Sequence, residues 1–426
     1  MSGTSIARVV GRQVFDSRGR PTVEADVFLE NGAFGQAIVP SGASTGRHEA
    51  HELRDGPPGE FEGRGVRRAA GNVSGELNGL LAGRDAFDQS DVDAAMLAAD
   101  GTANLSRLGA NAVLSVSLAV ARAAADARRM PLYRYLAGLD PRLVPSLPLP
   151  MANILSGGAH AGESMDFQDF LAVPIGARTI EEAIAIIARV RSAAGEEMAD
   201  EGLSVLLADE GGLSPGYSHA SQALDLMMRA FRRAGLNAGD DVAIALDVAA
   251  CELFDNGSYH LRREGRSLDG GEMVQLLVDL CRRYPIVSVE DPLADEDWDA
   301  WRNITAALSP IQVVGDDLFV TSAARIEEGA ARGAANAVLI KLNQNGTLTG
   351  TLEAMVVARA RGYATIVSAR SGETEDAFIS DLAVATGAGQ IKIGSLRNSE
   401  RLAKYNQLLR IAEDSDLTFA GKGALA

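Results

Sequence analysis

Short apolar runs that end on a charged residue recur through the stretch from Asp241 to Gly394. These runs are β-rich and do not alternate between apolar and polar positions, which is typical of parallel strands buried on both faces of a sheet. The segments between them have helical spacing, and several units are about 25 residues long, as in βα repeats that close into a barrel. The charged residues that end the runs are Asp247, Glu290, Asp316, Lys341 and Lys392. Because the C-terminal ends of barrel strands form the active-site face, we expect these side chains to meet there.

The pattern before this stretch predicts a second kind of domain. Apolar and polar residues alternate over 6–10, 22–29 and 35–39, and Asn31-Gly32 is a good hairpin turn between the last two segments, so we expect an antiparallel meander. Helical periodicity follows at 63–83, 90–99 and 109–128.

The Pro-rich segment Pro141–Pro150 predicts an extended connector between the two patterns. We therefore expect an α/β protein with a small N-terminal α+β domain over residues 1–140. A C-terminal barrel domain is expected over residues 141–426.

The start of the second domain carries further polar residues. Residues 152–162 are small and predict a loop that holds His160, whereas 166–173 predicts a strand that presents Gln168 and Asp169. After a predicted helix at 179–200, the apolar run 204–208 predicts a strand. That run is followed by Asp209-Glu210-Gly-Gly, so we expect Glu210 to be exposed between the strand and the glycine pair.

The segment Pro40–Gly46 is rich in small residues and has no periodicity. It fits either an ordinary surface loop or a mobile flap whose hydroxyls and amides reach a phosphate or a metal ion.

Composition narrows the function. The 426 residues favour two domains, and the formal charge of −17 argues against nucleic acid or an anionic membrane as the main partner. An anionic substrate would need a local reversal of the field, from metal ions or clustered lysines and arginines. The two cysteines form no disulfide framework, and the N-terminus has no signal-peptide apolar core, so we expect a soluble, cytoplasmic protein.

Three carboxylates that converge without a cation would repel one another, so Asp247, Glu290 and Asp316 favour a bound divalent cation. Ligands that are all oxygen favour Mg²⁺ over zinc. Each acid taken alone also fits a helix cap or an ion pair with arginine, but three in register on one face do not.

The two lysines suggest the chemistry of the site. A lysine held near Mg²⁺ and a second lysine should have a lowered pKa, which suits Lys341 for removing a proton α to a carboxylate. The metal charge would stabilise the enediolate that forms. If a β-substituent then leaves, an acid must protonate it from the opposite side, and Glu210 is the leading candidate.

With these residues in place, the chain resembles the enolase family. The resemblance is carried in order along nearly the whole chain by Asp16-Ser-Arg-Gly, Ser41-Gly-Ala-Ser-Thr-Gly, Asp209-Glu-Gly-Gly, Ser288-Val-Glu-Asp-Pro, Gly315-Asp-Asp-Leu-Phe-Val-Thr, Ile340-Lys-Leu-Asn-Gln, Arg370-Ser-Gly-Glu-Thr-Glu-Asp and Ala403-Lys-Tyr-Asn-Gln-Leu-Leu-Arg.

The resemblance implies the enolase fold, an α+β cap on a modified (β/α)8 TIM-like barrel. It implies Asp247, Glu290 and Asp316 as Mg²⁺ ligands, Lys341 as the base and Glu210 as the acid, with Asp169 and His160 beside it. It also implies substrate binding by Lys392, Arg370, Ser371 and Gln168, and Ser44 on substrate and a second Mg²⁺. Family members are generally dimers or larger, and Glu24 and Arg410 match a pair that bridges the dimer interface.

Several residues depart from the family's pattern. Enolases have His-Arg-Ser-Gly-Glu-Thr-Glu-Asp where this chain has Ala369-Arg-Ser-Gly-Glu-Thr-Glu-Asp, and no histidine follows His260. The family's Gln-Glu-Phe is Gln168-Asp169-Phe here, Lys-Thr-Gly is Lys392-Ile-Gly, and Ser156 stands where asparagine is usual. Losing an imidazole and a methylene opens space near the phosphate and the leaving group.

We therefore favour a carbon–oxygen lyase that acts on 2-phosphoglycerate or a close phosphorylated or phosphonate analogue. It would be a specialised paralogue similar to the carboxyphosphonoenolpyruvate synthases of antibiotic biosynthesis. The alternative is a housekeeping enolase that converts 2-phosphoglycerate to phosphoenolpyruvate in glycolysis. A third hypothesis is a non-catalytic enolase-like binding protein, which should have lost metal ligands or the base.

Overall fold

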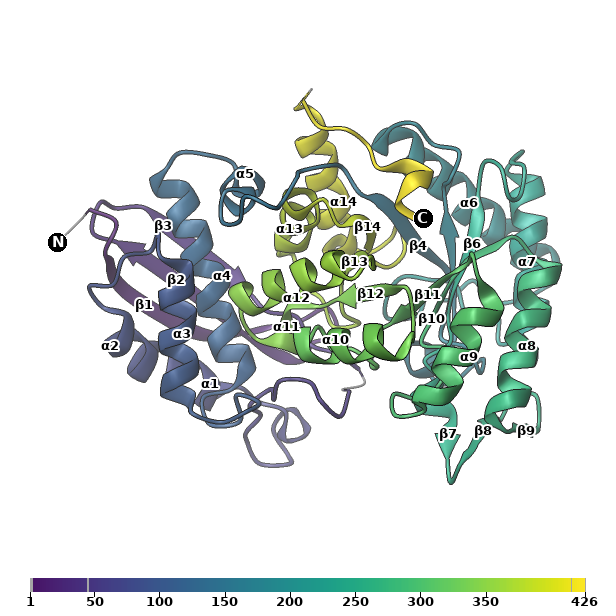
Figure 1. Cartoon of the computed structure of the whole chain (residues 1–426), viewed down its shortest axis with the longest axis horizontal. Coiled ribbons are helices and arrows are strands. Elements are labelled where there is room, and N and C mark those ends of the chain that lie inside the picture. The colour runs from purple at the N-terminus through teal and green to yellow at the C-terminus, as the bar shows by residue number, and fades with distance from the viewer. Residues whose placement is uncertain (1–2, 44–45, 415, 426) are drawn as a thin grey trace.

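The computed structural model describes residues 3–43, 46–414 and 416–425. Its N-terminal part is the predicted meander with helices on one face (Figure 1). The strands are β1 (Ile6–Phe15), β2 (Pro21–Leu29) and β3 (Phe34–Ile38), in the order β1-β2-β3 and all antiparallel. The helical segments are η1 (Phe61–Gly63), α1 (Arg67–Asn72), the π-helical turn η2 (Val73–Leu77), α2 (Asn78–Leu81), α3 (Gln89–Asp100), α4 (Ala110–Ala127) and α5 (Leu132–Ala137).

Helix α4 packs against β2 and β3 and is almost completely buried. The close approach depends on Gly35 of β3, since a Cβ there would lie 2.1 Å from the carbonyl oxygen of Ala119. The apolar length of α4 is therefore a core feature of this domain. No helix among the described residues is both long and apolar enough to cross a membrane.

The second part is a closed eight-stranded barrel with strand order β10-β11-β12-β13-β14-β4-β5-β6. Its strands are β4 (Leu149–Ser156), β5 (Asp169–Val173), β6 (Ala243–Asp247), β10 (Ile286–Glu290), β11 (Gln312–Gly315), β12 (Ala337–Ile340), β13 (Ala364–Ser368) and β14 (Gly389–Lys392). The five apolar runs of the sequence thus form strands β6, β10, β11, β12 and β14, as predicted.

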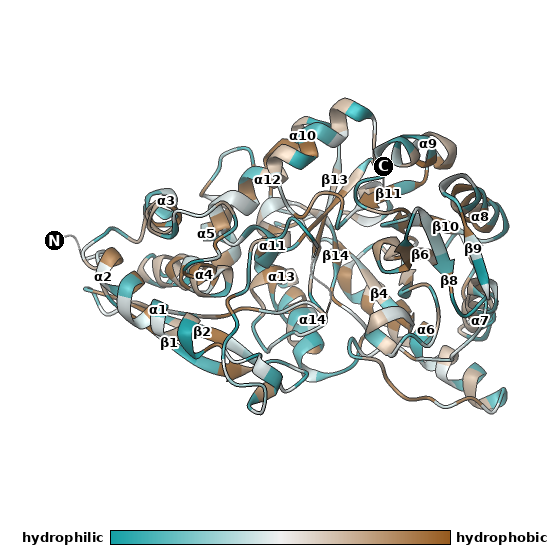
Figure 2. Cartoon of the chain, turned by 90° about the horizontal axis from the view of Figure 1, so that it is seen from below, coloured by the Kyte–Doolittle hydropathy of each residue, from teal (hydrophilic) through white to brown (hydrophobic). Residues whose placement is uncertain are grey.

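Helices surround the barrel. They are α6 (Ile180–Asp200), α7 (Ala220–Arg233), α8 (Gly270–Arg283), α9 (Trp298–Leu308), α10 (Ala323–Arg332), α11 (Leu342–Asn345), α12 (Leu348–Ala360), α13 (Phe378–Thr386) and α14 (Ser399–Ala412). In Figure 2 the outer helices α8 and α9 carry both hydrophobic and hydrophilic stretches, as expected for one face on the barrel and one toward solvent. The remaining short elements are η3 (Gly158–Ala161), η4 (Ala250–Leu253), the hairpin strands β7 (Phe254–Asp255), β8 (Ser258–Leu261) and β9 (Arg266–Leu268), and η5 (Gly421–Leu425).

Two predictions about the barrel were wrong, those for residues 152–156 and 204–208. Residues 152–156 belong to strand β4 and not to a loop, because this run is buried along its whole length and pairs with β5. Strand β5 is antiparallel to both β4 and β6, since residues 157–168 form a short return and not a helical crossover. Residues 204–208 form no strand, because β5 already fills the position between β4 and β6, and Leu206 is left 73% exposed.

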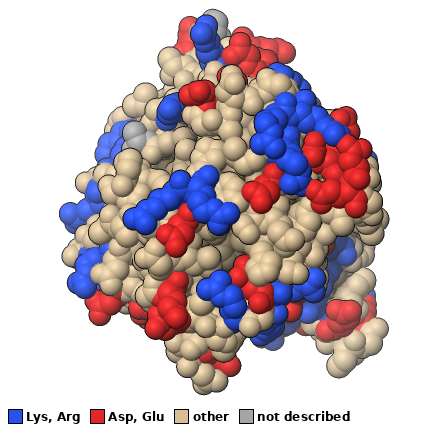
Figure 3. All heavy atoms as spheres, turned by 90° about the vertical axis from the view of Figure 1, so that its right-hand side faces the viewer, with Lys and Arg blue, Asp and Glu red and all other residues tan. Residues whose placement is uncertain are grey.

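The surface of the barrel end carries both signs of charge. Figure 3 shows lysine and arginine side chains interspersed with aspartate and glutamate over this face. This face therefore carries charges of both signs, although the formal net charge of the whole chain is −17.

The two parts of the chain are joined by a partly buried ion pair. Arg122 of α4 contacts both carboxylate oxygens of Asp376, which precedes α13, at 2.6 and 2.7 Å. The Asp376 carboxylate also accepts a hydrogen bond from the backbone N–H of Ile38 at 3.0 Å. Burial raises the pKa of Asp376, but Arg122 and these hydrogen bonds outweigh it and hold the pKa below its ordinary value.

Replacing Arg122 should destabilise the fold because Asp376 would stay buried without its cation. We expect Arg122→Met to lower the free energy of unfolding by about 2 kcal/mol, measured by urea denaturation. The matched control is Arg67→Met, which removes an exposed ion pair with Glu60 and should cost about 0.5 kcal/mol or less. Equal losses in the two variants would show that the partly buried pair does not join the domains as argued.

Candidate active site

The C-terminal strand ends bring the predicted carboxylates together. Asp247 ends β6 and Glu290 ends β10, and their Cα atoms are direct partners across these two strands. Asp316 follows β11, the next strand around the barrel. All three side chains are buried, so their charges need compensation within the protein.

The two predicted lysines supply that compensation. Lys392 Nζ lies 2.7 Å from Asp247 Oδ2 and 2.7 Å from Glu290 Oε2. Lys341 Nζ forms a salt bridge with Asp316 Oδ2. The five charged residues that end the apolar runs therefore form one ionic network at one end of the barrel.

The pKa values of both lysines in this network are raised by the carboxylates that they contact. Burial lowers the pKa of Lys341, but the Asp316 carboxylate raises it by more. Burial likewise lowers the pKa of Lys392, and Asp247 and Glu290 outweigh it. The lowering predicted for Lys341 was for a lysine beside Mg²⁺, and it stays a prediction.

Further acids around Asp316 enlarge the negative cluster. Carboxylate oxygens of Asp291, Asp316 and Asp317 lie within 4.8 Å of one another. Asp291 accepts hydrogen bonds from the backbone N–H groups of Asp316 and Asp317 at 2.8 and 2.9 Å, so it also fixes the end of β11. Burial and the Asp317 carboxylate raise the pKa of Asp291 well above its ordinary value.

This donor set fits a hard divalent cation, because it offers buried carboxylate oxygens and no sulfur ligand. Gln168, one of the predicted substrate-binding residues, donates to Asp247 Oδ2 at 3.2 Å. The side-chain oxygen of Gln168, Oε1, is buried and has no hydrogen-bond partner in the described structure. A site with excess acids and an unused oxygen ligand is suited to bind a cation.

A second group of titratable residues lies beside this network. His160 Nδ1 lies 3.4 Å from Asp169 Oδ2 and 3.7 Å from Glu210 Oε1. Asn153 of β4 donates to Glu210 Oε2 at 3.2 Å. The structure thus brings together the three residues predicted to act at the leaving group.

Glu210 is only 5% exposed, so the prediction that it is exposed was wrong. Gly211 adopts a left-handed conformation with φ of 83°, and Leu213 beyond it donates to the carbonyl of Ile154. This turn directs Glu210 inward over β4. Sequence periodicity could not show the turn, because it depends on pairing with a distant strand.

The three groups shift one another's pKa values. Burial lowers the pKa of His160, but Glu210 and Asp169 raise it above its ordinary value of 6.5. Burial raises the pKa of Asp169. Burial also acts to raise the pKa of Glu210, but His160 outweighs it and lowers that pKa. Of the two acids, Asp169 therefore holds a proton more readily than Glu210 does.

Ser156 and Asp169, two of the departures from the family's pattern, contact each other. The Ser156 hydroxyl donates to Asp169 Oδ1 at 2.7 Å, and both residues are fully buried. The space is tight, since a Cβ on Gly212 would lie 2.3 Å from the Ser156 hydroxyl oxygen. A longer acid at position 169 would displace this hydroxyl, so the two residues suit each other.

Arg370 and Ser371, the predicted phosphate-binding pair, follow β13 and are buried. The hydroxyl of Ser371 accepts a hydrogen bond from Arg18 Nη1 at 3.2 Å. Ser41, in the predicted loop Pro40–Gly46, exchanges backbone hydrogen bonds of 2.8 and 2.9 Å with Gly372, which follows this pair. Ser44, the remaining predicted ligand, lies outside the described residues.

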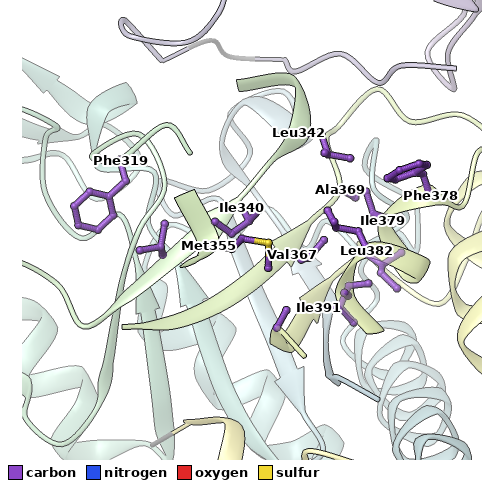
Figure 4. Packing of buried hydrophobic residues seen from close by; sticks show 14 of the residues in the cluster. Phe319, Ile340, Leu342, Met355, Val367, Ala369, Phe378, Ile379, Leu382 and Ile391 are labelled. Carbon is purple, nitrogen blue, oxygen red and sulfur yellow. The ribbon is translucent and has the colours of Figure 1, made fainter. Parts of the chain in front are cut away.

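Ala369 lines the same cleft as Lys341, Lys392 and Arg370. Its methyl group belongs to an apolar cluster with Leu342, Phe378 and Ile379 (Figure 4). No polar side-chain atom stands at this position, so the cleft has one donor fewer than an imidazole would provide. Ile393, which follows Lys392, is also fully buried.

Several polar residues that line the cleft or contact its lining residues were not predicted from sequence. They are Asp291, Asp317, Asn153, Gln344 and Glu49. The first two lie within motifs already noted, and Gln344 ends another, so motif membership was the available signal. Asn153 and Glu49 had none, because their roles depend on contacts far along the chain.

Glu24 and Arg410, the predicted interface pair, have other partners within the described part of one subunit. Glu24 pairs with Arg12, and Arg410 contacts Gln407 at 3.3 Å.

Comparison with known families covers nearly the whole chain. Residues 6–136 match the family described as enolase, N-terminal domain. Residues 144–425 match the family described as enolase, C-terminal TIM barrel domain.

The raised pKa of His160 can be tested directly. We expect imidazole ¹⁵N NMR to give a pKa above 6.5 for His160. Asp169→Asn should lower it, because one neighbouring negative charge is lost. By the same linkage, protonated His160 stabilises the fold below pH 6.5, and this contribution is lost as pH rises through the folded-state pKa. A pKa at or below 6.5, or one unchanged by the substitution, would contradict this account.

Proposed function

The chain belongs to the enolase family, and on this basis we propose that it is a Mg²⁺-dependent carbon–oxygen lyase. It would remove the α-proton of 2-phosphoglycerate or a close phosphorylated or phosphonate analogue and expel a β-group. The observation that carries the proposal is the buried network in which Lys341 and Lys392 pair with the three acids at adjacent strand ends.

The strand order supports a base and an acid on opposite sides of the substrate. Lys341 follows β12, whereas Asp169 starts β5, which lies four places further along the closed order of eight strands. Glu210 contacts Asn153 of the neighbouring strand β4. A substrate bound at the centre would therefore have Lys341 on one side and Glu210 on the other.

Members of this family typically use Mg²⁺, and we assign its ligands here to Asp247, Glu290 and Asp316, with Ser44 as a ligand to a second ion. When bound, Mg²⁺ supplies the positive charge that stabilises negative charge developing on the substrate carboxylate.

The chain's own residues handle the protons. Lys341 must be neutral to accept the C2 proton, so its salt bridge with Asp316 must weaken when that carboxylate takes up another partner. Lys392 holds the substrate carboxylate. Because the pKa of Glu210 is lowered, the proton for the leaving group is stored on His160 or Asp169 and passes through Glu210.

Arg370 and Ser371 would bind the phosphate, and Ala369 beside them favours a changed substrate. An imidazole at this position would occupy part of the cleft and donate a hydrogen bond. The methyl group of Ala369 is smaller and donates none. We therefore favour a specialised paralogue similar to the carboxyphosphonoenolpyruvate synthases, whose substrate carries a larger or different anionic group.

The alternative is a housekeeping enolase, and the intact lysines and acids are equally compatible with it. A non-catalytic binding protein is the least favoured hypothesis, because neither the proposed base nor any proposed metal ligand is lost. We further propose a cytoplasmic homodimer or larger homo-oligomer, in which Glu24 and Arg410 contribute to the interface.

A coupled assay with 2-phosphoglycerate separates the two enzymatic hypotheses. We expect the wild-type protein to form phosphoenolpyruvate only slowly, and the double variant Ala369→His, Asp169→Glu to form it faster, by about tenfold or more. Turnover by the wild type at a rate normal for an enolase would rule out the specialised paralogue.

Solvent exchange of the C2 proton of 2-phosphoglycerate tests the base directly. In deuterated buffer with Mg²⁺, NMR should show exchange by the wild type and a loss of about 10³-fold in Lys341→Ala. Glu210→Gln should retain exchange, because the acid acts only after proton removal. Exchange that persists at the wild-type rate in Lys341→Ala would remove the proposed role of this lysine.

A further inference from the structure

Residues 46–50 bring the acidic side chain of Glu49 against Arg370, which lines the active-site cleft. This segment lies between β3 and η1, and the N–H of Ala50 donates to the carbonyl of Gln344 at 2.9 Å. The Glu49 side chain is only 6% exposed, whereas His48 beside it points outward and contacts Glu296 at 2.8 Å. The segment therefore has one link to the barrel inside the site and one outside it.

Inside the site, Glu49 holds Arg370 with both carboxylate oxygens. Arg370 Nη1 lies 3.1 Å from Glu49 Oε2, and Nη2 lies 3.3 Å from Glu49 Oε1. Asn343 Oδ1 accepts a further hydrogen bond from Nη1 at 2.9 Å. A carboxylate that faces two nitrogens of a guanidinium sets the plane of the group as well as its position.

The same carboxylate reaches the acids through Gln344. Gln344 Nε2 lies 3.3 Å from Glu49 Oε1 and donates to Asp316 Oδ1 at 2.8 Å. The side-chain oxygen of Gln344, Oε1, accepts a hydrogen bond from the Thr321 hydroxyl at 2.8 Å. That hydroxyl oxygen accepts one from the backbone N–H of Lys341. One chain of hydrogen bonds thus connects Glu49 with Arg370, Asp316 and the backbone of Lys341.

We propose that Glu49 is a positioning residue that fixes the plane of Arg370 toward a bound phosphate or phosphonate group. This inference rests on the proposed function, in which Arg370 binds that group. Glu49 does not touch reacting atoms in this role. It determines the direction in which the Arg370 donors point, and it does so from the N-terminal domain.

The substitution Glu49→Gln weakens the contact with Arg370 and keeps the contact with Gln344. An amide nitrogen cannot accept a hydrogen bond from Arg370, so one oxygen of the pair is lost, while the amide oxygen can still accept from Gln344. We therefore expect binding of 2-phosphoglycerate in the presence of Mg²⁺ to weaken by about tenfold, measured by calorimetry. The melting temperature and the affinity for Mn²⁺ alone should stay close to the wild-type values.

The matched control is Glu296→Gln, which removes the outer link to His48 and touches neither Arg370 nor Gln344. It should leave 2-phosphoglycerate affinity unchanged. A lower melting temperature with unchanged affinity in Glu49→Gln would show a merely structural role and overturn the inference. If Glu49→Gln does not fold, Glu49→Asp decides, because its shorter side chain keeps the charge but cannot face both nitrogens. It should bind about threefold more weakly or worse, and wild-type affinity would overturn the inference.

Failure of the proposed function gives a different result. In that case the wild-type protein itself binds neither 2-phosphoglycerate nor inorganic phosphate, and the positioning role falls with it. Wild-type binding with equal affinity in Glu49→Gln would overturn only the role of Glu49.

Discussion

The closure of the eight-stranded barrel forces charges of like sign into one buried space. Adjacent strands end side by side, so Asp247, Glu290 and Asp316 cannot move apart without breaking strand pairing. Burial and mutual repulsion oppose their ionisation, and burial and Asp247 raise the pKa of Glu290 well above its ordinary value. Lys392 and Lys341 provide the opposing charge from β14 and the end of β12. The fold thus depends on the positive charges of Lys341 and Lys392 at the place where a metal ion and an anionic substrate would also bind.

The two lysines therefore stabilise the buried acids and also belong to the proposed active site. A lysine that neutralises a carboxylate is protonated and cannot act as a base, so a new partner for the acid changes the lysine as well. The second group pairs His160 with Asp169 and Glu210 and lies across the barrel from Lys341. Ala369 lies in the same cleft beside these networks, and Ser156 is hydrogen-bonded to Asp169 of the second one.

Most of the secondary structure followed from local pattern, and the failures share a cause. The meander, α4 and the five charged-ended strands were predictable because periodicity and turn residues are local signals. Strand β4 was missed because Asn153 and small residues interrupt its apolar character, although the strand is buried along its length. The run 204–208 is apolar and has no free sheet edge to join, which no local pattern reveals. The inward turn of Glu210 and the reach of Glu49 to Arg370 likewise depend on pairings between distant segments.

The sequence by itself determined the barrel, the residues at its strand ends and the family to which they belong, because strand composition and ordered motifs are written along the chain. It also identified Ala369 and Asp169 as departures from that family's pattern. Only the tertiary structure decided which charges touch: that Lys392 bridges two acids, that Ser156 meets Asp169, and that Glu49 faces Arg370. The residues that form these contacts lie 13 to 321 positions apart in the sequence. The pKa shifts of the charged groups arise from distance and burial, which exist only in the folded chain.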